Sequence, residues 1–203
     1  MTHSPNMFVG VGTGRCGTLS LARILDGVEG VSVKHEGYHI TRAKAHNGIY
    51  PIDAQRMLAR FSHGSTRLEG HVGALWTGFV PVLRLQFPVL PVICMHRSRD
   101  AVVESFMAVQ TARDLPWSIN IGGYTPTVDR DYLAGHWDWC ESVMSRIKSP
   151  VIHLDVSDLN DDNKLAEVYD FLHIDEARRV YPEKRVWHQG TNSLDGRGGE
   201  YAA

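Results

Sequence analysis

The stretch FVGVGTGRCGTLSLARIL, residues 8–25, decides how this chain folds. Phe8, Val9 and Val11 are typical of a short buried strand, and the apolar residues from Leu19 onward recur at helical spacing. Glycines 10, 12, 14 and 17 form a flexible turn between the two. A strand, a glycine-rich loop and a helix in this order can surround an anion with backbone N–H groups and a helix N-terminus.

The charge and hydroxyl groups of this stretch favour a phosphate site over an ordinary strand-to-helix turn. Arg15 supplies a fixed positive charge, and Thr18 and Ser20 supply hydroxyl donors at the start of the predicted helix. Glycines that merely tighten a turn remain the alternative.

Composition limits the function classes that fit this chain. The chain has 203 residues and a net charge of −2, so no overall basic field indicates nucleic acid or an anionic membrane. The N-terminus has no secretory pattern, and no apolar run approaches the length of a membrane helix. Cys16, Cys94 and Cys140 are too widely spaced for a disulfide framework or a zinc ribbon. We therefore expect a cytoplasmic protein with one domain, residues 1–203, and a glycine-rich tail from about residue 189.

Strand and helix patterns alternate along the chain. The strands that we predict after the first are 31–34, 66–71, 88–95 and 151–154. The helices that we predict after the first are 54–61, 75–87, one that begins at Asp100, 131–147 and 165–172. This alternation predicts an α/β fold with three α/β/α layers around a central parallel sheet. The long loop at 111–129, with Trp117 and Tyr124, is a candidate lid over the site.

A second anion site is predicted where another buried strand ends. Ligands of such sheets bind at the carboxyl ends of the strands. Arg97 directly follows the strand at 88–95, and Ser105 lies about two turns along the next helix. A guanidinium and a hydroxyl at this edge can jointly hold a phosphate. Taken singly, a surface arginine and a packed helix serine are the alternatives.

These two motifs resemble those of the sulfotransferases that use 3′-phosphoadenosine 5′-phosphosulfate (PAPS), which have a P-loop-like fold. The family's first motif, K/R-S-G-T-T/S between a strand and a helix, is matched by the run from Arg15 to Ser20. Its second motif, an arginine at a strand end and a serine eight positions later, is matched by Arg97 and Ser105. The resemblance covers roughly residues 7–175.

The resemblance implies a site, a co-substrate and a product. The first loop would hold the 5′-phosphosulfate with Arg15 at the transferring group, and Arg97 and Ser105 would hold the 3′-phosphate. PAPS would be the co-substrate and 3′-phosphoadenosine 5′-phosphate (PAP) the product, with no metal ion. The residues that would bind the nucleotide are Gly12, Thr13, Gly14, Arg15, Cys16, Gly17, Thr18, Leu19, Ser20, Arg97 and Ser105.

Two residues are candidates for the general base that accepts the proton of the acceptor hydroxyl or amine. Glu36 follows the second strand and resembles the glutamate that carbohydrate and tyrosylprotein sulfotransferases carry there. His71 ends the third strand and resembles the catalytic histidine of aryl and steroid sulfotransferases. We favour Glu36 and keep His71 as its alternative. A small-molecule or carbohydrate acceptor would lie between these two residues and the loop at 115–124.

Two other functions must be weighed. The run His35-Glu36-Gly37-Tyr38-His39 formally satisfies the zinc-protease motif H-E-x-x-H, but it follows a strand pattern and contains a glycine where the motif needs a continuous helix. A P-loop kinase or NTPase also has a strand, a loop and a helix in this order. Its G-x-x-x-x-G-K-[ST] motif, with the phosphate-binding lysine, is absent here.

Overall fold

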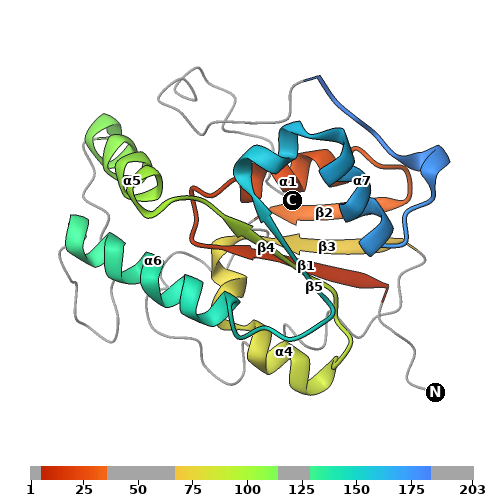
Figure 1. Ribbon diagram of the computed structural model, residues 1–203, viewed down its shortest axis with the longest axis horizontal. Helices are drawn as coiled ribbons and strands as arrows, with labels where there is room; N and C mark the ends of the chain where they lie inside the picture. Colours follow the sequence, from red (N-terminus) through yellow and green to blue (C-terminus); the bar gives the residue numbers. More distant parts are fainter. Residues whose placement is uncertain (1–5, 36–66, 114–128, 184–203) are drawn as a thin grey trace.

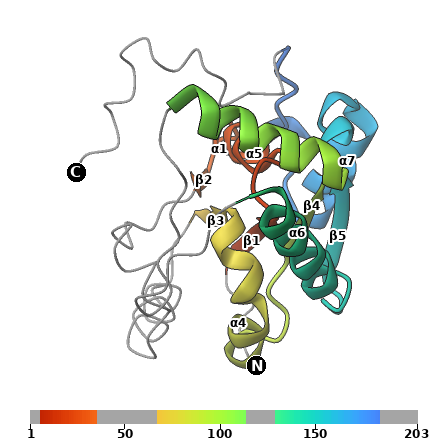
Figure 2. The ribbon, with the colours of Figure 1, turned by 90° about the vertical axis from the view of Figure 1, so that its left-hand side faces the viewer.

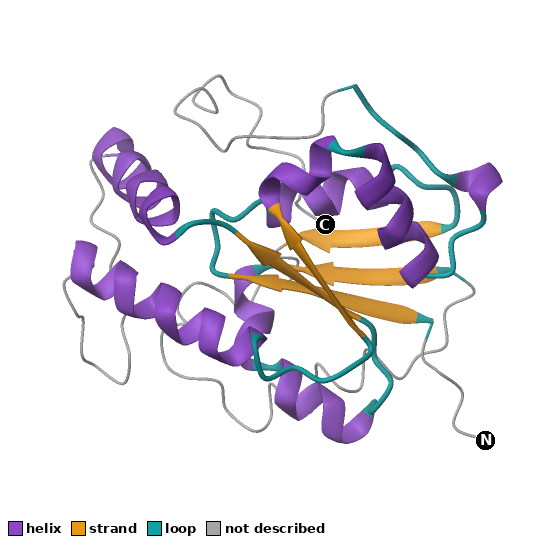
Figure 3. Cartoon of the chain, viewed as in Figure 1, coloured by secondary structure: helices purple, strands orange, loops and turns teal. Residues whose placement is uncertain are grey.

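The computed structural model describes residues 6–35, 67–113 and 129–183. Within them, five strands form one parallel sheet in the order β2-β3-β1-β4-β5. The strands are β1 (Met7–Gly12), β2 (Val31–His35), β3 (Leu68–Val72), β4 (Val92–His96) and β5 (Val151–Asp155). The predicted α/β fold with a central parallel sheet is confirmed, and Figure 3 shows the strands between helices on both sides.

Helices cover both faces of the sheet. In Figure 1, α1 and α7 lie on one face, and α4 and α6 lie on the other. The α-helices are α1 (Thr18–Asp26), α4 (Val80–Gln86), α5 (Arg99–Arg113), α6 (Arg130–Met144) and α7 (Asp162–Phe171). Short 3-10 helices are η1 (Ala74–Gly78), η2 (Val156–Asn160) and η3 (Glu176–Arg178). This arrangement is the three-layer architecture that the alternating pattern predicts.

Strand β1 is buried on both faces because it lies at the centre of the sheet. Phe8 points into the core beneath α1 and α7, whereas Val9 and Val11 point into the core that includes Trp76. Gly10 has no room for a side chain, since a Cβ there would lie 2.9 Å from both methyl groups of Val72. Burial on both faces explains why the strand is an almost continuous apolar run.

Two predicted elements differ from the observed ones. The stretch predicted as one helix, 75–87, is the 3-10 helix η1 followed by α4, and Pro81 lies in the first turn of α4. Proline fits that position because the N–H groups of a helix's first turn have no partner within the helix. The strand predicted from residue 88 begins only at Val92, because Pro88 and Pro91 have no N–H to donate to a strand ladder. The helix predicted over 54–61 lies outside the described residues.

Helices α5 and α6 bring side chains to the carboxyl end of the sheet. Figure 1 shows α5 beyond the ends of the strand arrows, and both views show it next to α6. The two helices contact each other through a small apolar cluster around Val103 and Leu133. In the described part of the chain, no helix is both long enough and apolar enough to cross a lipid bilayer.

Candidate functional site

The loop between β1 and α1 has an unusual backbone. Gly14, Arg15 and Gly17 have φ angles of 75°, 56° and 93°, all in the left-handed region. Glycine adopts this region freely, but an arginine there carries a backbone cost. Strained residues of this kind occur preferentially at binding and catalytic sites, so the loop is a candidate site on its geometry alone.

Two helices hold the beginning of this loop. The buried hydroxyl of Thr77, from η1, accepts a hydrogen bond from the Gly12 N–H at 3.0 Å and donates one to the Gly12 carbonyl at 2.7 Å. His136 of α6 places its Nε2 3.2 Å from the Thr13 carbonyl oxygen, which can only accept. The sequence does not indicate either contact, because both residues are far from the loop along the chain.

The two predicted anion sites adjoin each other. The Nε–H of Arg15 donates to Oγ of Ser105 at 3.0 Å, although ninety positions separate the two residues. Arg97 donates from Nη1 to the Arg15 carbonyl oxygen at 2.9 Å. The indole N–H of Trp137 in turn donates to the Arg97 carbonyl at 2.9 Å, which ties α6 to the end of β4. The structure thus brings Arg15, Arg97 and Ser105 together at the carboxyl edge of the sheet.

Cys16 points away from this edge and into the core. Its side chain is fully buried in the cluster beneath α1, and burial raises the pKa of its thiol. A Cβ at Gly12 would lie only 2.3 Å from the sulfur, so this contact requires glycine at position 12. Ser20 is also fully buried. The side chains of Cys16 and Ser20 therefore belong to the packing beneath the loop.

The start of α1 suits an anion. The helix has no acidic residue in its first turn and no side-chain cap at its N-terminus. Its first residue, Thr18, is buried, and its Oγ1 lies 3.3 Å from Nε2 of His35, the last residue of β2. Burial, together with the nearby charge of Arg23, lowers the pKa of His35 to about 4, so the imidazole is neutral at pH 7.

The low pKa of His35 predicts a pH-dependent stability. Below pH 6.5 the unfolded chain protonates this ring, whereas the folded chain does so only near pH 4, so stability decreases as the pH falls through this range. Between pH 7 and pH 5, we expect the free energy of unfolding of wild type to fall by about 2 kcal/mol more than that of His35→Gln. Urea unfolding of both proteins at the two pH values measures this difference. Equal losses would show that the pKa of His35 is not lowered in the folded protein.

Of the two candidate bases, the structure describes His71 but not Glu36. His71 lies in β3, where it is paired with Val9, and is buried on the face of the sheet that α1 does not cover. Its ring and the ring of Trp76 are steeply inclined to each other, with 5.3 Å between the ring centroids. Glu36 lies outside the described residues, as do Trp117, Tyr124 and the central part of the predicted lid, 114–128. The ends of that loop are regular, since α5 extends to Arg113 and Asp129 caps α6.

The zinc-protease hypothesis finds no support in the geometry of its first histidine. His35 ends a β-strand, whereas H-E-x-x-H requires a helix that carries both histidines on one face. His39 lies outside the described residues. Among the residues that are described, no group of three or more histidine, cysteine, aspartate or glutamate side chains is placed to hold a metal ion.

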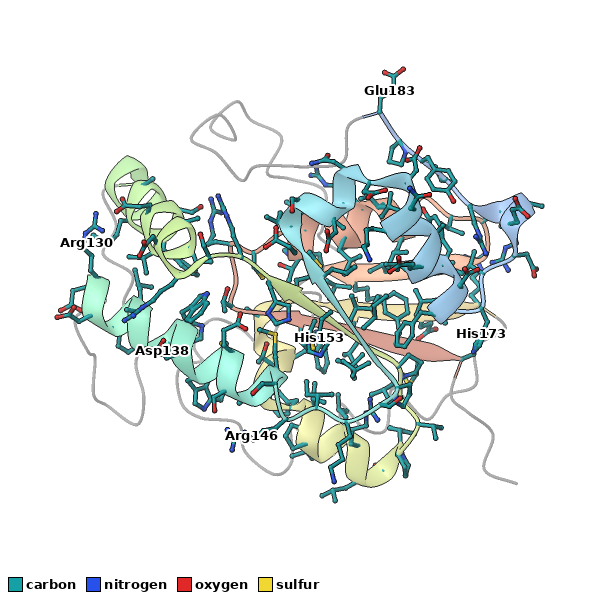
Figure 4. The ribbon with its side chains drawn as sticks, viewed as in Figure 1. Arg130, Asp138, Arg146, His153, His173 and Glu183 are labelled. Carbon is teal, nitrogen blue, oxygen red and sulfur yellow. The ribbon has the colours of Figure 1, made fainter. Side chains whose placement is uncertain are left out.

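A cavity of about 610 Å³ lies away from this site, between α4 and the segment after α6. It is lined by Val80, Pro81, Arg84, Pro88, Val143, Arg146, Ile147, Lys148 and Ser149. These residues come from α4, from the end of α6 and from the turns that lead into β4 and β5, and Figure 4 shows Arg146 on the α4 side of the molecule. The cavity therefore adjoins the amino ends of the strands, whereas parallel sheets bind ligands at the carboxyl ends.

Comparison with known proteins identifies the class of fold. A crystal structure of a sulfotransferase from Alicyclobacillus acidocaldarius is similar, with a TM-score of 0.57 and 13% sequence identity over 89% of this chain and 85% of that chain. No protein-family model matches the sequence. No curated protein matches it either. The chain thus has a sulfotransferase-like α/β fold, and at this identity the similarity establishes the fold alone.

Proposed function

We propose that this protein transfers a sulfuryl group from PAPS to a hydroxyl or amine of a small-molecule or carbohydrate acceptor. The observation that carries the proposal is the hydrogen bond from Arg15 to Ser105, together with that from Arg97 to the backbone of Arg15. The 3′- and 5′-phosphates of one nucleotide are attached to the same ribose, so the groups that bind them must be neighbours. Two guanidinium groups at one sheet edge meet this requirement.

The proposed reaction is a single displacement at sulfur. The acceptor oxygen or nitrogen forms a bond to sulfur while the bond from sulfur to the 5′-phosphate oxygen breaks, and PAP leaves. The acceptor proton passes to the carboxylate of Glu36, with the imidazole of His71 as the alternative base. Arg15 and the N–H groups of the loop stabilise the charge that develops on the bridging oxygen and the sulfuryl group, as in phosphoryl transfer.

Nucleotide binding tests the proposal against the kinase alternative. We expect PAP to bind more tightly than ATP, because ATP carries no 3′-phosphate for Arg97. Arg97→Ala is expected to weaken PAP binding about ten- to hundred-fold, since hydrogen bonds to charged groups contribute about 1.5–3 kcal/mol. Isothermal titration calorimetry measures both affinities.

Arg99 provides a matched control for the Arg97 variant. It lies two positions further along, and its guanidinium faces Asp138 at 3.6 Å on the surface. Arg99→Ala is expected to leave PAP binding unchanged. A preference for ATP, or an unchanged PAP affinity in Arg97→Ala, contradicts the proposal.

The base is tested by substitutions that preserve shape. Glu36→Gln is expected to bind PAP as wild type does and to lose turnover, because an amide cannot accept the acceptor proton. PAP release from PAPS, with a panel of hydroxyl and amine acceptors, measures turnover. Full activity in Glu36→Gln assigns the base to His71, and His71→Gln is then expected to be inactive.

A further inference from the structure

The histidine of the discarded zinc motif touches the candidate anion loop. His35 ends the edge strand β2, and its Nε2 lies 3.3 Å from the hydroxyl oxygen of Thr18, the first residue of α1. Thr18 is 4% exposed, so its hydroxyl group has little access to bulk water. The contact joins the outermost strand of the sheet to the first residue of α1, directly after the loop.

The direction of this hydrogen bond decides what the Thr18 hydroxyl can do. A threonine hydroxyl has one proton to donate, and a neutral imidazole has one N–H and one accepting nitrogen. If Nε2 of His35 accepts, the Thr18 proton is directed at the ring and is lost to any ligand. If Nε2–H donates to Oγ1, the Thr18 proton must point elsewhere.

An anion at the start of α1 favours the second arrangement. The helix N-terminus has partial positive charge and no acidic residue in its first turn, so an anion there meets no side-chain repulsion from that turn. A hydroxyl proton directed at such an anion forms a charge-assisted hydrogen bond, which is stronger than one to a neutral nitrogen. His35 is neutral at pH 7 and can therefore adopt the required tautomer.

We propose that His35 is a positioning residue of the anion site: it donates from Nε2–H to Oγ1 of Thr18 and so directs the Thr18 hydroxyl proton to the bound anion. The identity of that anion, the 5′-phosphosulfate end of PAPS, rests on the proposed function. The positioning itself needs only an anion beside Thr18. His35 acts through Thr18, so its effect on binding requires the threonine hydroxyl.

A double-mutant cycle with PAP as the probe tests this dependence. His35→Phe is expected to weaken PAP binding about two- to ten-fold, the range that one hydrogen bond of ordinary strength provides. His35→Gln is expected to restore most of the affinity, because its amide also donates. In Thr18→Val, the further change His35→Phe is expected to have no additional effect. His173→Asn serves as the control, since Figure 4 places His173 at the opposite end of the sheet from α5.

A spectroscopic measurement separates positioning from a purely structural role. In the PAP complex at pH 7, ¹⁵N NMR of the His35 ring is expected to show a proton on Nε2 and none on Nδ1. An Nδ1–H tautomer, or equal PAP affinity in wild type and His35→Phe, overturns the inference. Additive losses in the double variant overturn it as well.

Failure of the proposed function gives a different result. If wild type does not bind PAP, the proposed nucleotide is wrong, and the same proteins are titrated with pyrophosphate instead. Pyrophosphate affinity is then expected to fall in His35→Phe, to recover in His35→Gln and to show no further change when His35→Phe is added to Thr18→Val. Equal pyrophosphate affinity in wild type and His35→Phe overturns the inference about His35, and so does an absence of pyrophosphate binding.

Discussion

Replacing Arg15 by glutamine is expected to lower the rate of PAPS turnover about 100- to 1000-fold, the range found when one preorganised transition-state donor is removed. The Nε–H of Arg15 donates to Oγ of Ser105, and Arg15 lies in the middle of a loop whose backbone has positive φ angles at three residues. In the proposed reaction, negative charge grows on the bridging oxygen as the sulfuryl group is transferred. A fixed positive charge therefore stabilises the transition state more than it stabilises the bound nucleotide before the reaction.

The comparison with lysine separates charge from geometry at this position. Arg15→Lys retains the charge and is expected to keep much of the turnover that Arg15→Gln loses. PAP release with the best available acceptor measures turnover, and calorimetry of PAP binding shows whether the nucleotide is still bound. Unchanged turnover in Arg15→Gln would remove Arg15 from the proposed reaction.

The largest expected effect on stability comes from Trp76, which is 1% exposed in the core between the sheet and the helices α4 and α6. Its ring is steeply inclined to the rings of His71 and Phe79, with ring centroids 5.3 Å and 6.3 Å away. Trp76→Ala is expected to lower the free energy of unfolding by about 3–5 kcal/mol, because apolar contacts are lost and a cavity remains.

Trp139 offers a control of the same residue type. It lies on α6 and is 49% exposed, so Trp139→Ala is expected to lower the free energy of unfolding by about 1 kcal/mol or less. Urea unfolding followed by far-ultraviolet circular dichroism measures both variants without relying on tryptophan fluorescence. Similar losses in the two variants would contradict the assignment of Trp76 to the core.

Local patterns in the sequence predict most of the fold. The apolar run around Phe8, the glycine turn and the helical spacing after Leu19 predict β1, the loop and α1, and all three occur. Each depends on neighbouring residues: apolar strands bury both faces, and glycine permits a positive φ. The failures are also local. Pro81 and Pro91 each lack a backbone N–H group, which affects where α4 and β4 begin. The spacing of apolar residues does not reveal this effect.

The sheet order cannot be predicted in this way. β1 pairs with β3 on one side and with β4 on the other, so strands distant in sequence become neighbours. The face on which His71 lies follows from its register with Val9, and a shift of one residue would reverse that face. The sequence therefore predicts His71 at a strand end but not its place beside Trp76.

The sequence by itself determined that residues 8–25 form a strand, a loop and a helix, and that arginine side chains follow two strands of a parallel sheet. These features depend on backbone conformation and on apolar spacing, which neighbouring residues control. Only the tertiary structure decided that Arg15 reaches Ser105 and that His35 reaches Thr18. Such contacts depend on how strands and helices from distant parts of the chain pack together, and local preferences carry no information about that packing.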